Sequence, residues 1–181
     1  MSTGRRSWII LGVAGVVVSA ILVSMLFNLR TPQSLGYRVD LLNKGEELRT
    51  VTVYYLHPDT LKLVPVEREV LGDLTSRELA GALVTYLSQP LEVFRAPLPL
   101  GTKLLHYFDD GAGDVVLDFN LHIGYLRGEG ILDERLRLAA LTRTLSENIR
   151  GVERARLMMH GRPLDRWGSH LALGEHVEVQ R

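Results

Sequence analysis

The spacing of apolar and polar residues divides the chain into an apolar N-terminal segment and a mixed segment that follows it. Residues 51–56 alternate with a period of two and are rich in Val, Thr and Tyr, which is typical of a strand. A second strand is expected over residues 63–70. Pro65 lies inside it and has no N–H to donate, so this strand should be an edge strand or carry a bulge. Regular structure is therefore expected to begin at Val51.

Two helices are expected where apolar residues recur every three or four positions. The first follows Thr75 and Glu78, which have the spacing of a capping box. The second begins near Asp133 and Glu134, because acidic side chains favour the positive end of the helix dipole. It ends at Gly151, where a left-handed C-terminal cap is expected.

Three further strands complete the pattern. They are expected at residues 103–108, 114–119 and 152–159. The resulting order, β-β-α-β-β-α-β, predicts an α+β fold in the form of a two-layer sandwich. In this fold two helices would cover one face of a mixed sheet.

The N-terminal apolar segment runs from Trp8 to Leu29 without a charged residue. As a helix of about 22 residues it would be about 33 Å long, enough to cross a hydrocarbon core of about 30 Å. A cleaved signal peptide is the alternative, but its apolar region is shorter and ends in small residues. We therefore predict an uncleaved anchor that spans the cytoplasmic membrane once. Gly15 and Ser19 are spaced so that two such helices could approach, which leaves self-association open.

Basic residues flank the anchor on both sides, so charge alone sets its orientation weakly. Arg5 and Arg6 precede it, and Arg30 and Arg38 follow it. We prefer the orientation that places the C-terminal part outside the cytoplasm. The expected divisions are residues 1–7 as a short cytoplasmic tail, 8–29 as the anchor, 30–49 as a tether and 50–181 as one extracytoplasmic domain.

Composition narrows the class of protein further. The chain has 21 basic and 21 acidic side chains, a formal net charge of +0 and no cysteine. This charge balance argues against a nucleic-acid-binding protein, which would carry a basic patch. The lack of cysteine excludes disulfides, thiolate chemistry and attachment of a lipid to a cysteine. An exported domain of this kind must be stabilised by its core alone.

Neither a metal site nor a cofactor site is predicted. Asp109, Asp110 and Asp114 surround a glycine-rich turn but lack the ligand spacing of a calcium loop. The six histidines include no pair at helical spacing, whereas zinc needs three or four converging ligands. Asp118, on the polar side of its strand, is the best single candidate for catalysis. The simpler interpretation is that its carboxylate accepts a hydrogen bond from the backbone near Asn120.

Apolar residues in predicted loops provide a candidate interaction surface. It comprises Trp167, Tyr125, Leu126 and Leu164, the last beside Pro163. Exposed aromatic side chains are common at interfaces. The alternative is that these side chains fold back over the helices.

Several segments, taken in order, resemble the GerMN domain, the sporulation and spore-germination domain of bacterial envelope proteins. They are the Tyr54-Tyr55 pair, residues 63–70, 99–105 and 115–120, and the string Leu141-Thr142-Arg143-Thr144-Leu145 that leads to the turn at Gly161. The resemblance implies a small domain outside the cytoplasmic membrane that assembles with partner proteins. It brings no catalytic residue that could be carried over.

The anchor and the resemblance together predict a non-catalytic envelope protein whose domain contacts other proteins, in sporulation, germination or envelope assembly. A peptidoglycan-binding module is the first alternative, motivated by the expected location alone. An envelope hydrolase that uses Asp118 or the acids of the glycine-rich turn is the second. No nucleic acid is expected as a partner.

Overall fold

The computed structural model describes residues 47–91 and 93–179. The predicted anchor from Trp8 to Leu29, the tail before it and most of the tether lie outside these residues. Within them, no helix is long and apolar enough to cross a membrane.

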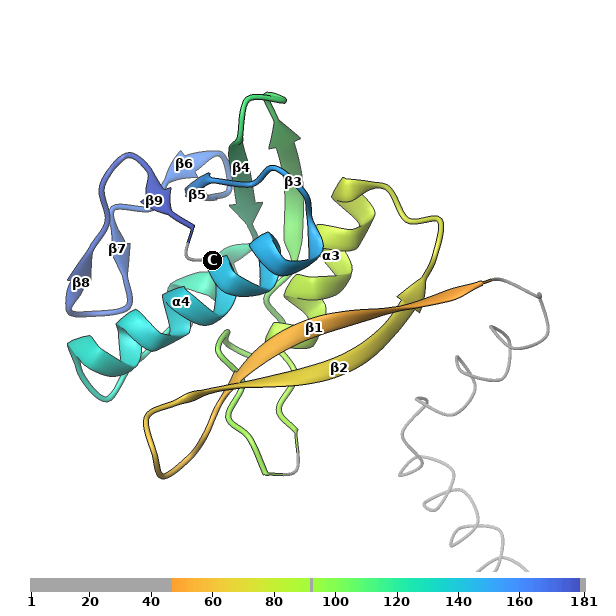
Figure 1. The fold of residues 1–181 in the computed structure, drawn as a ribbon. Helices are drawn as coiled ribbons and strands as arrows, with labels where there is room; N and C mark the ends of the chain where they lie inside the picture. Colours follow the sequence, from red (N-terminus) through yellow and green to blue (C-terminus); the bar gives the residue numbers. More distant parts are fainter. Residues whose placement is uncertain (1–46, 92, 180–181) are drawn as a thin grey trace, which may run out of the picture. The chain divides into compact units, whose positions relative to one another are not determined.

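The described elements follow the predicted order as far as the fifth strand (Figure 1). They are β1 (Leu48–Leu56), β2 (Leu63–Leu71), α3 (Ser76–Leu87), β3 (Leu104–Asp109), β4 (Asp114–Phe119), the 3₁₀ helix η1 (Leu121–Tyr125), α4 (Ile131–Asn148), β5 (Arg154–Met159), β6 (Arg162–Pro163), β7 (Arg166–Trp167), β8 (Leu171–Ala172) and β9 (Val177–Glu178). β1 begins three residues before the expected Val51. The capping box at Thr75 is present, and Gly151 has the expected positive φ, at 84°.

The mixed sheet is present, but it does not contain the first two strands. It has the order β3-β4-β5-β6, and β9 also pairs with β5. The β3–β4 pair is antiparallel and the β4–β5 pair is parallel. β1 and β2 instead form a separate antiparallel hairpin, so the expectation of a single sheet is wrong.

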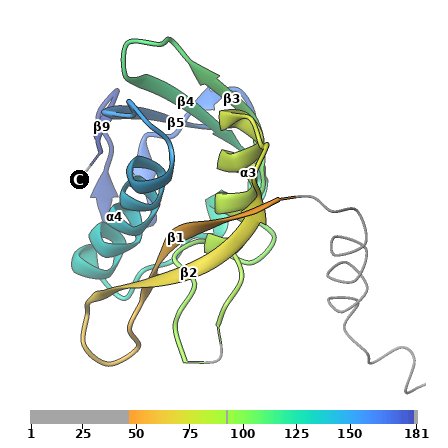
Figure 2. The same ribbon diagram turned by 45° about the vertical axis from the view of Figure 1, so that its right-hand side comes forward.

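The two helices lie between the hairpin and the five-stranded sheet in both views (Figures 1 and 2). They cover one face of the sheet, as predicted, and together with β1 they enclose the main core. Its most buried members include Val53, Leu83, Leu117 and Leu145, each 0% exposed. The hairpin therefore adds a cover on the far side of the helices, which a two-layer sandwich does not have.

Polar side chains of α4 explain why β1 stays apart from the sheet. The Asn148 amide accepts a hydrogen bond from the Thr52 N–H at 3.0 Å and donates one to the Thr52 carbonyl at 2.7 Å. The Thr144 hydroxyl accepts a hydrogen bond from the Tyr54 N–H at 3.0 Å. Further along, Leu56 exchanges backbone hydrogen bonds with Arg95. This edge of β1 is thus occupied and cannot pair with another strand.

β2 is an edge strand, as Pro65 predicted, because among the described strands it pairs with β1 alone. The proline contributes no N–H to a ladder, which suits a strand without a second neighbour. At the other end of β2, the Tyr86 hydroxyl donates a hydrogen bond to the Glu69 carbonyl at 2.7 Å. Charged residues and proline on such an edge discourage pairing with another chain.

Substituting Asn148 by alanine tests the contact between α4 and β1. The change leaves the N–H and carbonyl of Thr52 without these partners, so we expect the free energy of unfolding to fall by about 2 kcal/mol. Urea denaturation measures it. Glu147→Ala, at an exposed position of the same helix, is the matched control and should change stability by less than about 0.5 kcal/mol. Equal losses in the two variants would contradict the assigned role of Asn148.

Candidate functional site

The face of the five-stranded sheet that the helices do not cover carries several exposed side chains. Strand pairing places Phe108, Val116 and Arg156 in one row across this face. Phe108 is 63% exposed, whereas Val116 and Arg156 are half-buried. An aromatic ring flanked by an aliphatic and a basic side chain is the kind of surface that proteins use to contact one another.

Asp118, the candidate for catalysis, lies on the same face but is 6% exposed. One of its carboxylate oxygens accepts the Gly161 N–H at 2.9 Å, and the other lies 3.1 Å from Nδ1 of His106. The first contact fixes the β5–β6 turn, where His160 and Gly161 both have positive φ. The simpler interpretation of Asp118, a hydrogen bond to backbone, is therefore confirmed in kind, although its partner is Gly161.

A His–Asp pair can also orient an imidazole for proton transfer. Here the side chain of His106 is 74% exposed on an open sheet face, where water surrounds it. A hydrolase also needs a site that holds a substrate in place beside the catalytic group. The arrangement favours a structural role for the pair.

The acids around the β3–β4 turn are engaged within the turn. Asp109 accepts the Gly111 N–H, and Asp110 accepts the N–H groups of Ala112 and Asp114. Asp114 itself forms a bidentate ion pair with Arg154. Among the residues that the structure describes, no three His, Cys, Asp or Glu side chains are grouped to hold a metal ion.

A second exposed apolar surface lies at the end of the sheet opposite this turn. We call it the tip, and it consists of the loop 99–102 together with η1. It presents Leu100, Leu121 and Tyr125, which are 73%, 57% and 67% exposed. Asn120 joins the two parts, because its side chain donates a hydrogen bond to the Gly101 carbonyl at 2.9 Å and accepts one from the Lys103 N–H at 3.1 Å.

The tip includes one of the four members of the predicted interaction surface and excludes the other three. Tyr125 is exposed, as expected. Trp167 is 0% exposed and Leu126 is 2% exposed, so the predicted exposure of these two is wrong. Leu164 is half-buried against the main core. Burial removes the apolar area of these side chains from water, which stabilises the fold.

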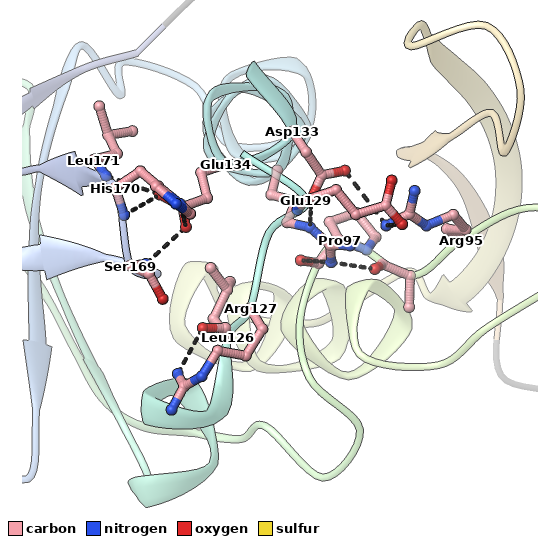
Figure 3. A network of polar contacts seen from close by, with 12 residues as sticks. Arg95, Pro97, Leu126, Arg127, Glu129, Asp133, Glu134, Ser169, His170 and Leu171 are labelled. Atoms are coloured by element: carbon pink, nitrogen blue, oxygen red, sulfur yellow. Dashed lines mark hydrogen bonds and ion pairs between the residues drawn. The ribbon is translucent and has the colours of Figure 1, made fainter. Parts of the chain in front are cut away.

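The beginning of α4 holds a buried polar network (Figure 3). Glu134 is 0% exposed and accepts hydrogen bonds from the N–H groups of Ser169, His170 and Leu171 at 2.6–2.8 Å. The ring of His170 adds a contact at 3.0 Å. Through these contacts one carboxylate fixes the turn between β7 and β8.

On the other side of α4, Asp133 and Arg137 hold the segment that follows the first helix. Arg137 Nε donates to Asp133 at 2.6 Å, and Arg137 also donates to the carbonyls of Ala96 and Pro97 at 3.1 Å. Arg95 lies 3.4 Å from both Asp133 and Glu129. The sequence placed Asp133 and Glu134 at a helix N-terminus. It did not reveal that both are buried and bind distant segments of the chain.

Two glycines leave room for the Glu134 side chain in this network. A Cβ atom at Gly128 or Gly168 would lie within 2.5 Å of a side-chain atom of Glu134. Both positions must therefore lack a side chain for the carboxylate to reach its place. Sequence alone does not show that these two glycines and Glu134 meet.

The contacts of Glu134 set its ionisation. Burial raises the pKa of its carboxyl, but the backbone donors and the His170 ring lower it more, to about 2 from 4.5. The carboxylate thus stays charged inside the protein at ordinary pH. Such a group stabilises the fold above pH 4.5, and its contribution is lost as the pH falls toward 2.

Comparison with known proteins identifies relatives in sequence and in fold. Residues 52–165, more than half of the chain, match the family Germane, described as sporulation and spore germination. The structure resembles the first GerMN domain of the sporulation protein GerM from Bacillus subtilis, with a TM-score of 0.55 and 17% identity. That match covers 72% of this chain and 97% of that domain. No protein of curated function matches the chain.

Two further structures show the same fold. The tandem GerMN domains of the same protein match with a TM-score of 0.57 and 17% identity over 73% of this chain. Since the match covers 46% of that longer chain, it corresponds to about half of the tandem. A candidate lipoprotein from Clostridium perfringens matches with a TM-score of 0.50 and 16% identity, over 72% of this chain and 87% of that one.

Replacing Glu134 by glutamine tests the buried network. The amide of the glutamine would place N–H groups against backbone donors, so we expect the free energy of unfolding to fall by about 3 kcal/mol near neutral pH. The wild type should also lose stability between pH 4.5 and 2, because protons bind the unfolded carboxyl first. The variant should lose less in this window.

Urea denaturation at neutral and at acidic pH measures both effects. Glu147→Gln, at an exposed position of the same helix, is the control and should follow the wild type at each pH. A pH dependence of Glu134→Gln equal to that of the wild type would contradict the assigned role of Glu134.

Proposed function

Because the chain belongs to the sporulation and spore germination family, we propose that it is a non-catalytic interaction domain of the bacterial envelope. In this proposal the apolar segment from Trp8 to Leu29 anchors the protein in the cytoplasmic membrane, and the folded domain lies outside the cytoplasm. The domain acts by contacting another envelope protein during sporulation, germination or envelope assembly.

The observation that carries the proposal is the uncovered face of the five-stranded sheet. Phe108 presents its ring there at 63% exposure, beside the aliphatic Val116. Arg156 continues the row, and the ion pair of Arg154 with Asp114 lies at its border. Interfaces concentrate their binding energy on aromatic and arginine side chains within a polar rim.

The length and composition of the N-terminal segment support the anchored location. Its charge-free run is long enough to span a bilayer as a helix. The likeness to a domain of the sporulation protein GerM concerns the fold, which this chain shares with that domain. A free domain would not require so long an apolar segment before it.

Labelling with a membrane-impermeant maleimide tests the location, since the chain has no cysteine of its own. Ala112→Cys, at the exposed β3–β4 turn, should react in intact bacteria whose outer layers have been made permeable. Ser2→Cys, in the predicted cytoplasmic tail, should react only after lysis. Protection of the thiol in the Ala112→Cys variant until lysis would contradict an extracytoplasmic domain.

Site-specific photocross-linking tests the interaction. With a photoreactive phenylalanine derivative in place of Phe108, the full-length protein in its own bacterium should form a discrete adduct with an envelope protein. The same derivative in place of Glu147, on the exposed side of α4, is the control and should give little product. Equal cross-linking at both positions, or co-sedimentation with purified peptidoglycan without any protein adduct, would contradict the proposed role of the sheet face.

A further inference from the structure

The tip combines exposed apolar side chains with basic ones. Leu100 lies next to Gly101, and Gly101 packs closely against the ring of His122. A Cβ atom added at Gly101 would lie 3.0 Å from that ring. His122 in turn contacts Tyr125 edge to face, with ring centroids 5.9 Å apart. Leu121 precedes His122 in η1. The three most exposed apolar side chains of this end are thus carried on two segments in direct contact.

Two exposed basic residues flank the tip in sequence. Lys103 follows the loop 99–102, and Arg127 follows η1. Lys103 is held through its backbone, which exchanges hydrogen bonds with Asn120. Arg127 donates to the carbonyls of Gly124 and Leu126 at the end of η1 (Figure 3). Its guanidinium is therefore held at the end of η1.

The acids closest to the tip in sequence have partners elsewhere. Asp118 accepts a hydrogen bond from the Gly161 N–H and contacts the ring of His106. Glu129 lies 3.4 Å from Arg95. The exposed charged side chains that flank the tip most closely in sequence, Lys103 and Arg127, are thus both basic. Aromatic and aliphatic side chains rimmed by Lys and Arg are suited to the interface of a bilayer with anionic headgroups.

We propose that the tip is a contact site for the surface of an anionic lipid bilayer. Leu100, Leu121 and Tyr125 enter the boundary between headgroups and acyl chains. Lys103 and Arg127 pair with lipid phosphates. The contact is reversible and weak, because three side chains bury far less apolar area than an amphipathic helix does.

This role goes beyond the proposed function and does not require it. A bilayer contact at the tip leaves the sheet face around Phe108 free for a protein. Failure of the cross-linking at Phe108 therefore leaves the lipid contact unaffected, and the reverse also holds.

Fluorescence quenching in vesicles tests the lipid contact with the full-length chain. Leu100→Cys carries an environment-sensitive fluorophore at the tip, and Ala112→Cys carries it at the other end of the β3–β4 hairpin, about 20 Å away along six-residue strands. Both proteins contain the same N-terminal segment, so any attachment to the vesicle through that segment is common to the two. The vesicles consist of phosphatidylcholine alone or of equal parts of phosphatidylcholine and phosphatidylglycerol, with brominated acyl chains as quencher.

The label at residue 100 should be quenched in anionic vesicles, and the label at residue 112 should not. Removing phosphatidylglycerol should reduce the quenching at residue 100. Lys103→Gln should lower the equilibrium constant for contact of the tip with the bilayer, read from the quenching at residue 100, about five-fold, the loss expected for one basic side chain near an anionic surface. Lys62→Gln, an exposed lysine in the β1–β2 turn, is the matched control and should leave it unchanged.

Leu121→Cys provides a second labelling position in η1 and should behave as residue 100 does. Equal quenching of the tip and turn labels would overturn the proposal. The proposal would also be overturned if the signal of the tip label did not depend on phosphatidylglycerol but changed with protein density in neutral vesicles. That result would indicate contact between protein copies. The near-ultraviolet circular dichroism of each variant checks that the fold is retained.

Discussion

A polar side chain that a helix buries must find a hydrogen-bond partner, and α4 buries several. Glu134 finds its partners in the β7–β8 turn, and Asp133 and Arg137 hold the segment after α3. Thr144 and Asn148 bind the backbone of β1. Because each unmet hydrogen bond would cost about 1–3 kcal/mol, the position of α4 determines where three distant segments can lie. The hairpin, the loop before β3 and the C-terminal strands are all organised around this one helix.

The elements that sequence predicted well are those whose signals are local. The capping box at Thr75 depends on residues three positions apart, and the helix formed where expected. Pro65 predicted an edge strand because proline lacks an N–H, which is a property of the residue itself. The alternation in β4 predicted which of its side chains face the core, and Val115, Leu117 and Phe119 are at most 1% exposed.

The features that sequence did not predict depend on contacts between distant residues. Two expected strands became a separate hairpin because Asn148, 96 residues after Thr52, occupies the edge of β1. An acid near a helix N-terminus suggests a dipole interaction. It gave no sign that Glu134 would be buried under a turn 35 residues later. Trp167 and Leu126 lie outside the long helices and strands, and their burial depends on whether the core has room for them, which one sequence does not show.

The helices cover a single face of the five-stranded sheet, and this asymmetry separates the two candidate surfaces. The open face needs no core packing, so Phe108 can be exposed there while Tyr107, its neighbour in β3, packs against the core. The tip lies at one end of the same strands, where loop 99–102 and η1 meet. A bilayer at the tip would therefore contact the end of the β3–β4 hairpin and leave its flank accessible. One small domain could in this way hold its position at a membrane while it contacts a protein through its open face.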